Sequence, residues 1–339
     1  MRSSQGFRAA VRLAVAAILL SASTGRAGII VGYDTSMASS HNTYDRFLSP
    51  FPAAPVTNST AQFLLSNFAS GTGTGSNLSG IGWNASVTNL GVTLVSQQHI
   101  IGNYHVFQGG NFAPGSQVKF LNRDGVVKTY TLSSAQPFRP TTTFNIGMGN
   151  QTLPSDVYLG TLSAPIPAAD HMDFFPVLNG SMSQFIGLPL FVYGQNPNYV
   201  NPSTGTASPH FGTNNITEIG LASFDGPVPT NEATEVYGYD FNSAMNGEIH
   251  VIGGDSGSPS VANIGGQLGL AGSHYGIDTT TNESFDTYLP FYINQLNTAM
   301  APTGFQLTVI GVPEPSSIVL VGLAAGFIVR RRFSKRAKA

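Results

Sequence analysis

Short apolar runs with a period of two are the feature that most restricts how this chain can fold. In residues 157–162 the odd-numbered side chains face one side of a predicted strand and the even-numbered ones face the other. Similar short runs cover residues 92–95 and 99–101, and Gly, Asn and Pro separate such runs along the chain. Because turn residues interrupt every run before a helix could form, the pattern predicts an all-β fold.

A loop at residues 253–259, Gly-Gly-Asp-Ser-Gly-Ser-Pro, has the composition needed to expose a nucleophilic serine. Its glycines permit a sharp turn, so the backbone N–H groups of Gly254 and Ser256 can point into one pocket. Two such donors stabilise the oxyanion of acyl transfer, each by roughly 3–4 kcal/mol. A Gly/Ser turn between two strands is the structural alternative, so this loop needs support from other residues.

A nucleophilic serine requires a base, and the base requires an orienting carboxylate. His105 follows the strands predicted at 92–95 and 99–101 and lies on a tight turn. Asp156 stands at the start of the strand predicted at 157–162. These two residues are the candidates for the base and the carboxylate.

Together the three blocks resemble the chymotrypsin-like (trypsin-like) serine proteases. The His, the Asp and the Gly-Asp-Ser-Gly-x-Pro motif occur in the chain order of that family. Residues 285–296 are similar to the family's last strand and C-terminal helix, so the resemblance covers roughly residues 80–300. It implies two six-stranded antiparallel β-barrels, at about 80–175 and 180–300, with a short C-terminal helix and an active site between the barrels.

The resemblance also implies roles for these residues. His105 would be the general base, Asp156 its orienting carboxylate and Ser256 the nucleophile, with the N–H groups of Gly254 and Ser256 as the oxyanion hole. The expected activity is that of a serine endopeptidase that cleaves a peptide or protein substrate through an acyl-enzyme. The alternative is a catalytically inactive protease-like barrel that acts as a surface or extracellular-matrix protein.

Three other residues could serve as the base or as the orienting carboxylate, but each is interpreted as structural. His99 is the other possible base, but its place in the family pattern assigns it to packing. Asp170 and Asp173 follow a Pro-rich turn and are expected in an exposed loop.

Substrate recognition is assigned by the same resemblance. His250, six residues before Ser256, would lie low in the specificity pocket, where an Asp would favour Lys or Arg. Ser273 and His274, in the strand expected at 270–275, would line the pocket wall. Trypsin-like cleavage is therefore not expected.

Metal and cofactor chemistry are not expected. The seven His residues lack metal-ligand spacing, and the chain has no Cys. An exported form must therefore fold without disulfides.

Both ends have the composition of targeting segments. Basic residues, an apolar run and small residues predict a signal peptide at 1–27. Residues 312–339 contain Pro-Glu-Pro, an apolar stretch and a basic tail, and they resemble the PEP-CTERM sorting signal of Gram-negative bacteria. This resemblance implies an exosortase-type processing enzyme, transient insertion of the C-terminal helix into the inner membrane, and delivery to the cell surface or extracellular matrix.

The remaining chain divides into an N-terminal segment (28–79), the protease domain (80–300) and a linker (301–311). Residues 30–32, Ile-Val-Gly, resemble the activating N-terminus of some family members, but their distance in sequence from His105 favours coincidence. Residues 28–312 hold five basic and 16 acidic residues, a net charge of −11. Nucleic acid is therefore an unsuitable partner.

Overall fold

The computed structural model describes residues 28–32 and 78–314, apart from short gaps at residues 87–89, 125, 146, 148, 201–206, 226–227 and 244. The predicted signal peptide, most of segment 28–79 and the apolar C-terminal stretch lie outside the described residues. Among the helices that are described, none is both long and apolar enough to cross a membrane. The described chain is mostly β, as the sequence predicted.

The first sheet contains six antiparallel strands in the order β6-β5-β2-β3-β4-β9. Its strands are β2 (Ile81–Asn84), β3 (Gly91–Leu94), β4 (His99–Asn103), β5 (Gln117–Leu121), β6 (Val127–Thr131) and β9 (Val157–Thr161). Just beyond the two edge strands, Leu132 and Leu162 form an isolated antiparallel bridge. A separate hairpin consists of β7 (Thr141–Asn145) and β8 (Asn150–Pro154), and a 3-10 turn, η2, covers Ala168–Asp170.

The apolar alternation seen in the sequence explains the core of this sheet. Val92, Leu94, Ile100 and Val118 pack together inside it and are fully buried. Strand β4 is buried along its whole length because it pairs with β3 on one side and β9 on the other. It ends at Asn103, and the short helix α2 (Tyr104–Gln108) begins at once. His105 is therefore carried by a rigid support.

The second sheet contains nine strands, where the sequence predicted six. They are β10 (Val177–Asn179), β11 (Pro189–Val200), β12 (Ala207–Asn215), β13 (Glu218–Ala222), β14 (Thr234–Asp240), β16 (Pro259–Ile264), β17 (Gln267–Asp278), β18 (Glu283–Thr287) and β19 (Val309–Gly311). All pairs are antiparallel except those that β10 makes with β17 and β19. A two-residue strand, β1 (Ile29–Ile30), pairs with β15 (Ile249–His250) beside this sheet.

The expected linker at 301–311 is instead part of the fold. It contributes the 3-10 turn η4 (Ala301–Thr303) and strand β19, which adds a parallel neighbour to β10. Leu307 is 4% exposed and belongs to a core cluster. This segment therefore accounts for one of the additional strands in the second sheet.

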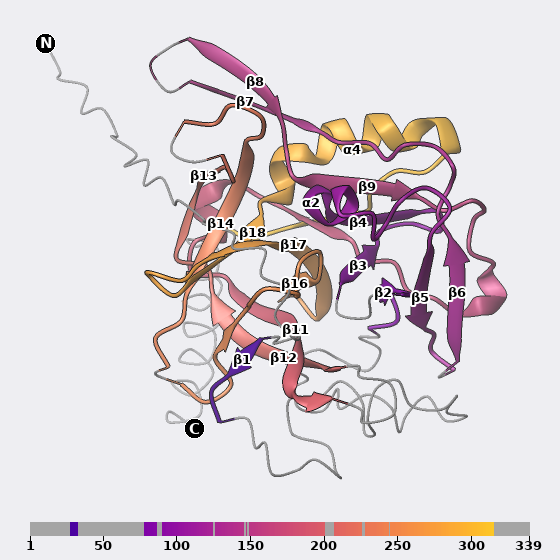
Figure 1. The fold of residues 1–339 in the computed structure, drawn as a ribbon, viewed down its shortest axis with the longest axis horizontal. Helices are drawn as coiled ribbons and strands as arrows, with labels where there is room; N and C mark the ends of the chain where they lie inside the picture. The colour runs from indigo at the N-terminus through magenta and orange to yellow at the C-terminus, as the bar shows by residue number, and fades with distance from the viewer. Residues whose placement is uncertain are drawn as a thin grey trace, which may run out of the picture.

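One core cluster joins the two sheets. It combines Ile101 and Leu159 of the first sheet with Tyr193 and Val261 of the second. The C-terminal helix α4 (Ile293–Met300), which follows the 3-10 turn η3 (Leu289–Tyr292), adds Leu296 and Met300 to the same cluster. In Figure 1 the first sheet lies at the right, the second lies at the centre and left, and α4 lies above them. The small helix α3 (Met182–Phe185) caps the second core through Phe185.

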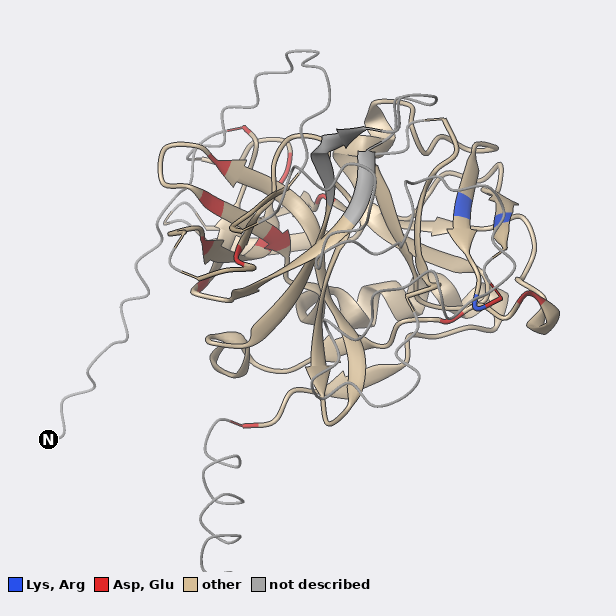
Figure 2. Ribbon diagram, turned by 90° about the horizontal axis from the view of Figure 1, so that it is seen from below, with Lys and Arg blue, Asp and Glu red and all other residues tan. Residues whose placement is uncertain are grey.

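Charge is distributed unevenly over the described residues. The described Lys and Arg residues all lie between residues 119 and 139, in or next to the first sheet. Acidic residues are concentrated on β13, β14 and β18 of the second sheet (Figure 2). The excess negative charge of the body therefore lies mainly on the second sheet.

Candidate active site

His105 and Asp156 are in direct contact. The ring Nδ1 of His105 is 2.7 Å from Asp156 Oδ2, and the backbone N–H of His105 donates to Asp156 Oδ1 at 2.7 Å. Since a carboxylate only accepts, Nδ1 carries the proton and Nε2 keeps a free lone pair. The imidazole thus has the tautomer and orientation of a general base.

Strand register explains how two residues 51 positions apart meet. In the β4–β9 pair, Asn103 lies opposite Val157, so the residues just beyond these two are neighbours. The N–H of Tyr104 donates to the carbonyl of Asp156 at 2.6 Å, and the Asn103 amide donates to Asp156 Oδ2 at 2.9 Å. The carboxylate is 1% exposed and receives three donors, which fix its position.

The surroundings of His105 act on its pKa in opposite directions. Burial lowers the pKa of the imidazole, whereas the charge of Asp156, its hydrogen bond and the charge of Glu232 raise it. The net result is a His105 pKa above its ordinary value. The protonated form of the His105 ring is therefore stabilised.

Ser256 lies on a loop (residues 252–258, called the Ser256 loop) that requires glycine. Gly254 has φ +110° and Gly257 has φ +80°, a region that glycine adopts without a steric cost. Two turns form the loop: the N–H of Asp255 donates to Ile252 O at 3.1 Å, and that of Ser258 donates to Asp255 O at 3.0 Å. Within the described part of the chain, the N–H groups of Gly254 and Ser256 have no acceptor. They remain available to a ligand.

The Ser256 loop packs on the strands that lead to His105. The N–H of Gly91, at the start of β3, donates to the carbonyl of Ser256 at 3.3 Å. A Cβ on Gly257 would clash with the carbonyl oxygen of Gly91 and would lie 3.7 Å from the backbone nitrogen of Asn103. Ser256 thus sits where β3 and β4 meet the second sheet. In the described structure Ser256 Oγ makes no hydrogen bond to His105.

Three residues predicted to bind substrate are instead buried. The Ser273 hydroxyl is 3.1 Å from Thr287 Oγ1. The His274 ring is 2% exposed, with Nδ1 2.7 Å from Asp286 Oδ1 and Nε2 2.5 Å from the carbonyl of Tyr193. Both ring nitrogens of His274 are occupied inside the second sheet, and its role in a specificity pocket stays a prediction.

His250 is 7% exposed and stacks on Phe241, with 5.4 Å between ring centroids. Burial lowers the pKa of this imidazole. Its Nε2 has no hydrogen-bond partner among the described residues.

The competing residues do not reach His105. His99 is 1% exposed, its Nδ1 is 2.8 Å from Ser96 Oγ, and burial lowers its pKa to about 4. Asp170 accepts hydrogen bonds from Lys128 and Tyr130, and Asp173 is paired with Arg123.

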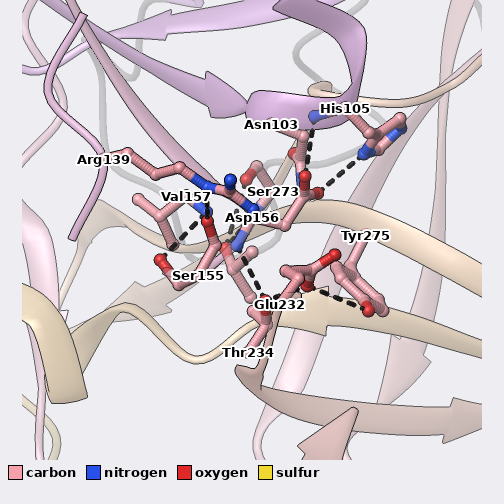
Figure 3. A network of polar contacts seen from close by, with 11 residues as sticks. Asn103, His105, Arg139, Ser155, Asp156, Val157, Glu232, Thr234, Ser273 and Tyr275 are labelled. Atoms are coloured by element: carbon pink, nitrogen blue, oxygen red, sulfur yellow. Dashed lines mark hydrogen bonds and ion pairs between the residues drawn. The ribbon is translucent and has the colours of Figure 1, made fainter. Parts of the chain in front are cut away.

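Sequence reasoning missed residues that surround the His105–Asp156 pair. Thr234 Oγ1 accepts the N–H of Asp156 at 2.8 Å, and the Thr234 hydroxyl donates to Glu232 Oε1 at 2.6 Å (Figure 3). Phe224 lies edge-on to the His105 ring at 5.3 Å. These residues come from a segment 119 or more positions after His105, so no local pattern could have identified them.

A further contact involves the start of the described chain. The backbone N–H of Gly28 donates to Asp255 Oδ2 at 2.9 Å, and the same oxygen accepts the N–H of Ile252 at 3.1 Å. The sequence interpretation treated the nearby residues 30–32 as a coincidental match, yet this segment does reach the residue before Ser256.

In the described part of the chain, no group of three His, Asp or Glu side chains is arranged to hold a metal ion. Among known families, the model of the PEP-CTERM protein-sorting motif matches residues 311–332. No curated protein matches the chain. The motif is a sorting signal recognised by exosortase-type processing enzymes, and it marks the chain as an exported bacterial protein sorted to the cell surface.

Proposed function

We propose that the body of this chain is an exported serine endopeptidase with a chymotrypsin-like arrangement of two β-barrels. The observation that carries the proposal is the His105–Asp156 contact, which lies beside a glycine-dependent loop that holds Ser256 and two N–H groups with no acceptor among the described residues. The bridge between the edges of the first sheet supports closure of a first barrel.

In this proposal Ser256 Oγ attacks the substrate carbonyl, and His105 Nε2 accepts its proton. The N–H groups of Gly254 and Ser256 stabilise the oxyanion that develops. His105 then returns the proton to the leaving amine, and a water activated by His105 hydrolyses the acyl-enzyme. Asp156 holds the imidazole throughout. Apo active sites often lack well-aligned catalytic hydrogen bonds, so the missing Ser256–His105 bond does not argue against this mechanism.

The test is covalent labelling of the purified protein with a fluorophosphonate probe, followed by peptide mapping. We expect the label on Ser256, with Ser256→Ala unlabelled and inactive. Ser183→Ala, which removes an exposed serine from α3, should label like the wild type.

The alternative function is an inactive protease-like surface or matrix protein. It would replace the endopeptidase if the wild type neither labels nor cleaves any member of a peptide library. Undiminished peptide cleavage by Ser256→Ala would refute the proposed mechanism.

The sorting signal also supports a proposal about where in the cell the protein is processed and where it acts. The host would be a Gram-negative bacterium, and the C-terminal apolar segment would insert into the inner membrane before processing. The acidic body would then act on peptide or protein substrates at the cell surface or in the extracellular matrix.

A further inference from the structure

A second carboxylate, Glu232, lies behind the His105–Asp156 pair. It is 8% exposed and lies at the end of a loop that precedes β14. Asp225 organises this loop, because its Oδ2 accepts the N–H groups of Asn231 at 2.6 Å and Glu232 at 3.2 Å. The backbone of Glu232 is therefore held in place by its hydrogen bond to Asp225.

Glu232 reaches Asp156 through one hydroxyl. The Thr234 O–H donates to Glu232 Oε1 at 2.6 Å, and Thr234 Oγ1 accepts the Asp156 N–H at 2.8 Å. The Tyr275 O–H also donates to Glu232 Oε1, at 3.2 Å. Figure 3 shows this chain of contacts running from Glu232 through Thr234 to the backbone N–H of Asp156, the residue whose carboxylate holds His105.

The same residues form a wall beside the His105 ring. Tyr275 stacks on Phe224 with 4.3 Å between ring centroids, and Phe224 contacts the edge of His105. Glu232 is thus linked on two sides to the His105–Asp156 pair, through Thr234 to the backbone of Asp156 and through Tyr275 and Phe224 to the His105 ring.

Among the described residues, the charged and titratable groups that interact with Glu232 are His105, Asp156, Arg139 and Tyr275. Burial and the charge of Asp156 raise the pKa of Glu232 to about 7, although Thr234, Arg139 and Tyr275 counteract this shift. The charge of Glu232 also raises the pKa of His105, so the two groups are electrostatically coupled and ionised Glu232 favours the protonated His105 ring.

We propose that Glu232 is a positioning residue for the His105–Asp156 pair, which it orients through Thr234 and whose imidazolium form it stabilises by its charge. The effect of this role on reaction kinetics rests on the proposed function, because it requires the protein to be an enzyme. The coupling between Glu232 and His105 can be measured whether or not the protein is an enzyme.

The test is an NMR titration of the His105 ring in the Ser256→Ala protein, with and without Glu232→Gln. Loss of the Glu232 charge should move the His105 titration to lower pH. Glu235→Gln is the matched control: burial raises the pKa of Glu235 to about 7 as well, yet its backbone N–H contacts Tyr292 instead of the triad. Glu235→Gln should leave the His105 titration unchanged. An unchanged titration in Glu232→Gln, or equal shifts in both variants, would overturn the proposal.

A second pair of variants keeps the test valid if Glu232→Gln does not fold. Thr234→Val removes the linking hydroxyl and with it the hydrogen bond that favours ionised Glu232, whereas Thr234→Ser retains that hydroxyl. Thr234→Val should lower the pH of the His105 titration, and Thr234→Ser should not. Identical titrations in the two Thr234 variants would contradict the proposed coupling.

Kinetics on a peptide substrate give the second readout. In the active protein, Glu232→Gln should move the acid limb of kcat/KM to lower pH. At high pH, the decrease in kcat/KM caused by Glu232→Gln should be far smaller than the ~10⁴–10⁶-fold loss typical of removing a triad member. Absence of all activity in the wild type, together with a shifted His105 titration, would refute the proposed function but leave the Glu232 coupling intact.

Discussion

The buried Asp156 carboxylate is stabilised because three donors converge on its two oxygens. The His105 ring, the His105 N–H and the Asn103 amide all donate to it. A buried charge without such partners would cost several kcal/mol, so this arrangement must be specified by the fold. It leaves His105 Nε2 as the one ring nitrogen that can accept a proton from a neighbouring hydroxyl.

The first prediction separates the two candidate bases. His105→Gln should reduce kcat/KM by about 10⁴-fold or more, because triad members act as a unit. His99→Gln should keep substantial activity, since His99 is held inside the core by Ser96. Peptide cleavage and thermal unfolding of both variants would be compared. Equal loss of activity in two folded variants would show that the base is misassigned.

The second prediction concerns pH. His105 must be neutral to accept a proton, and its pKa lies above the ordinary value of 6.5 despite burial, because of the charge and hydrogen bond of Asp156 and the charge of Glu232. Activity should therefore be low in acid and rise with pH, with a midpoint of kcat/KM above 6.5. A midpoint of kcat/KM well below that value would indicate that a group other than His105 controls the rate.

At the level of structural elements, the Ser256 loop depends on the first sheet. Gly257 combines a φ of +80° with close approach to the carbonyl oxygen of Gly91 on β3. A side chain there would strain the backbone and push the loop away from β3. The position of Ser256 is thus a property of two sheets and not of its own loop alone.

The third prediction uses two glycines of this loop. Gly257→Ala should abolish fluorophosphonate labelling of Ser256 and lower the melting temperature. Gly253→Ala is the matched control, because a Cβ on Gly253 would meet no atom within 4 Å. It should label almost like the wild type. Normal labelling of Gly257→Ala would show that the loop does not need its packing on β3.

Local patterns in the sequence predicted the elements better than their assembly. Alternation identified β3, β4 and β9, and the turn and strand start placed His105 and Asp156 correctly against each other. The nine-stranded sheet was not predicted, because β19 pairs with β10, more than 130 residues earlier. The burial of His274 was not foreseen either, because its partner Asp286 belongs to the neighbouring strand β18. Glu232 and Thr234 were missed because their interactions with His105 and Asp156 are entirely non-local.

For the molecule as a whole, the described part of the fold reaches the start of the sorting signal at residue 311. The N–H of Val312 donates to Asn179 O at 2.8 Å, the Gln184 amide donates to Val312 O, and Val312 is 4% exposed. Pro313 and Glu314, the next two residues, are exposed. Cleavage just beyond Val312 would therefore remove the tail without breaking a contact of β19.

The last prediction concerns this processing. The apolar stretch at 316–329 is 14 residues long, shorter than the ~20 residues of a typical spanning helix, which suits a segment that is cut better than a permanent anchor. Mass spectrometry of the surface fraction from the native host should find a body that lacks residues 318–339. A chain truncated after residue 314 should unfold at the same temperature as the processed body, whereas truncation after residue 308 should lower that temperature, because it removes β19 and Val312 from the second sheet. Recovery of intact protein in the inner membrane, still carrying residues 330–338, would refute processing and indicate a membrane-anchored form.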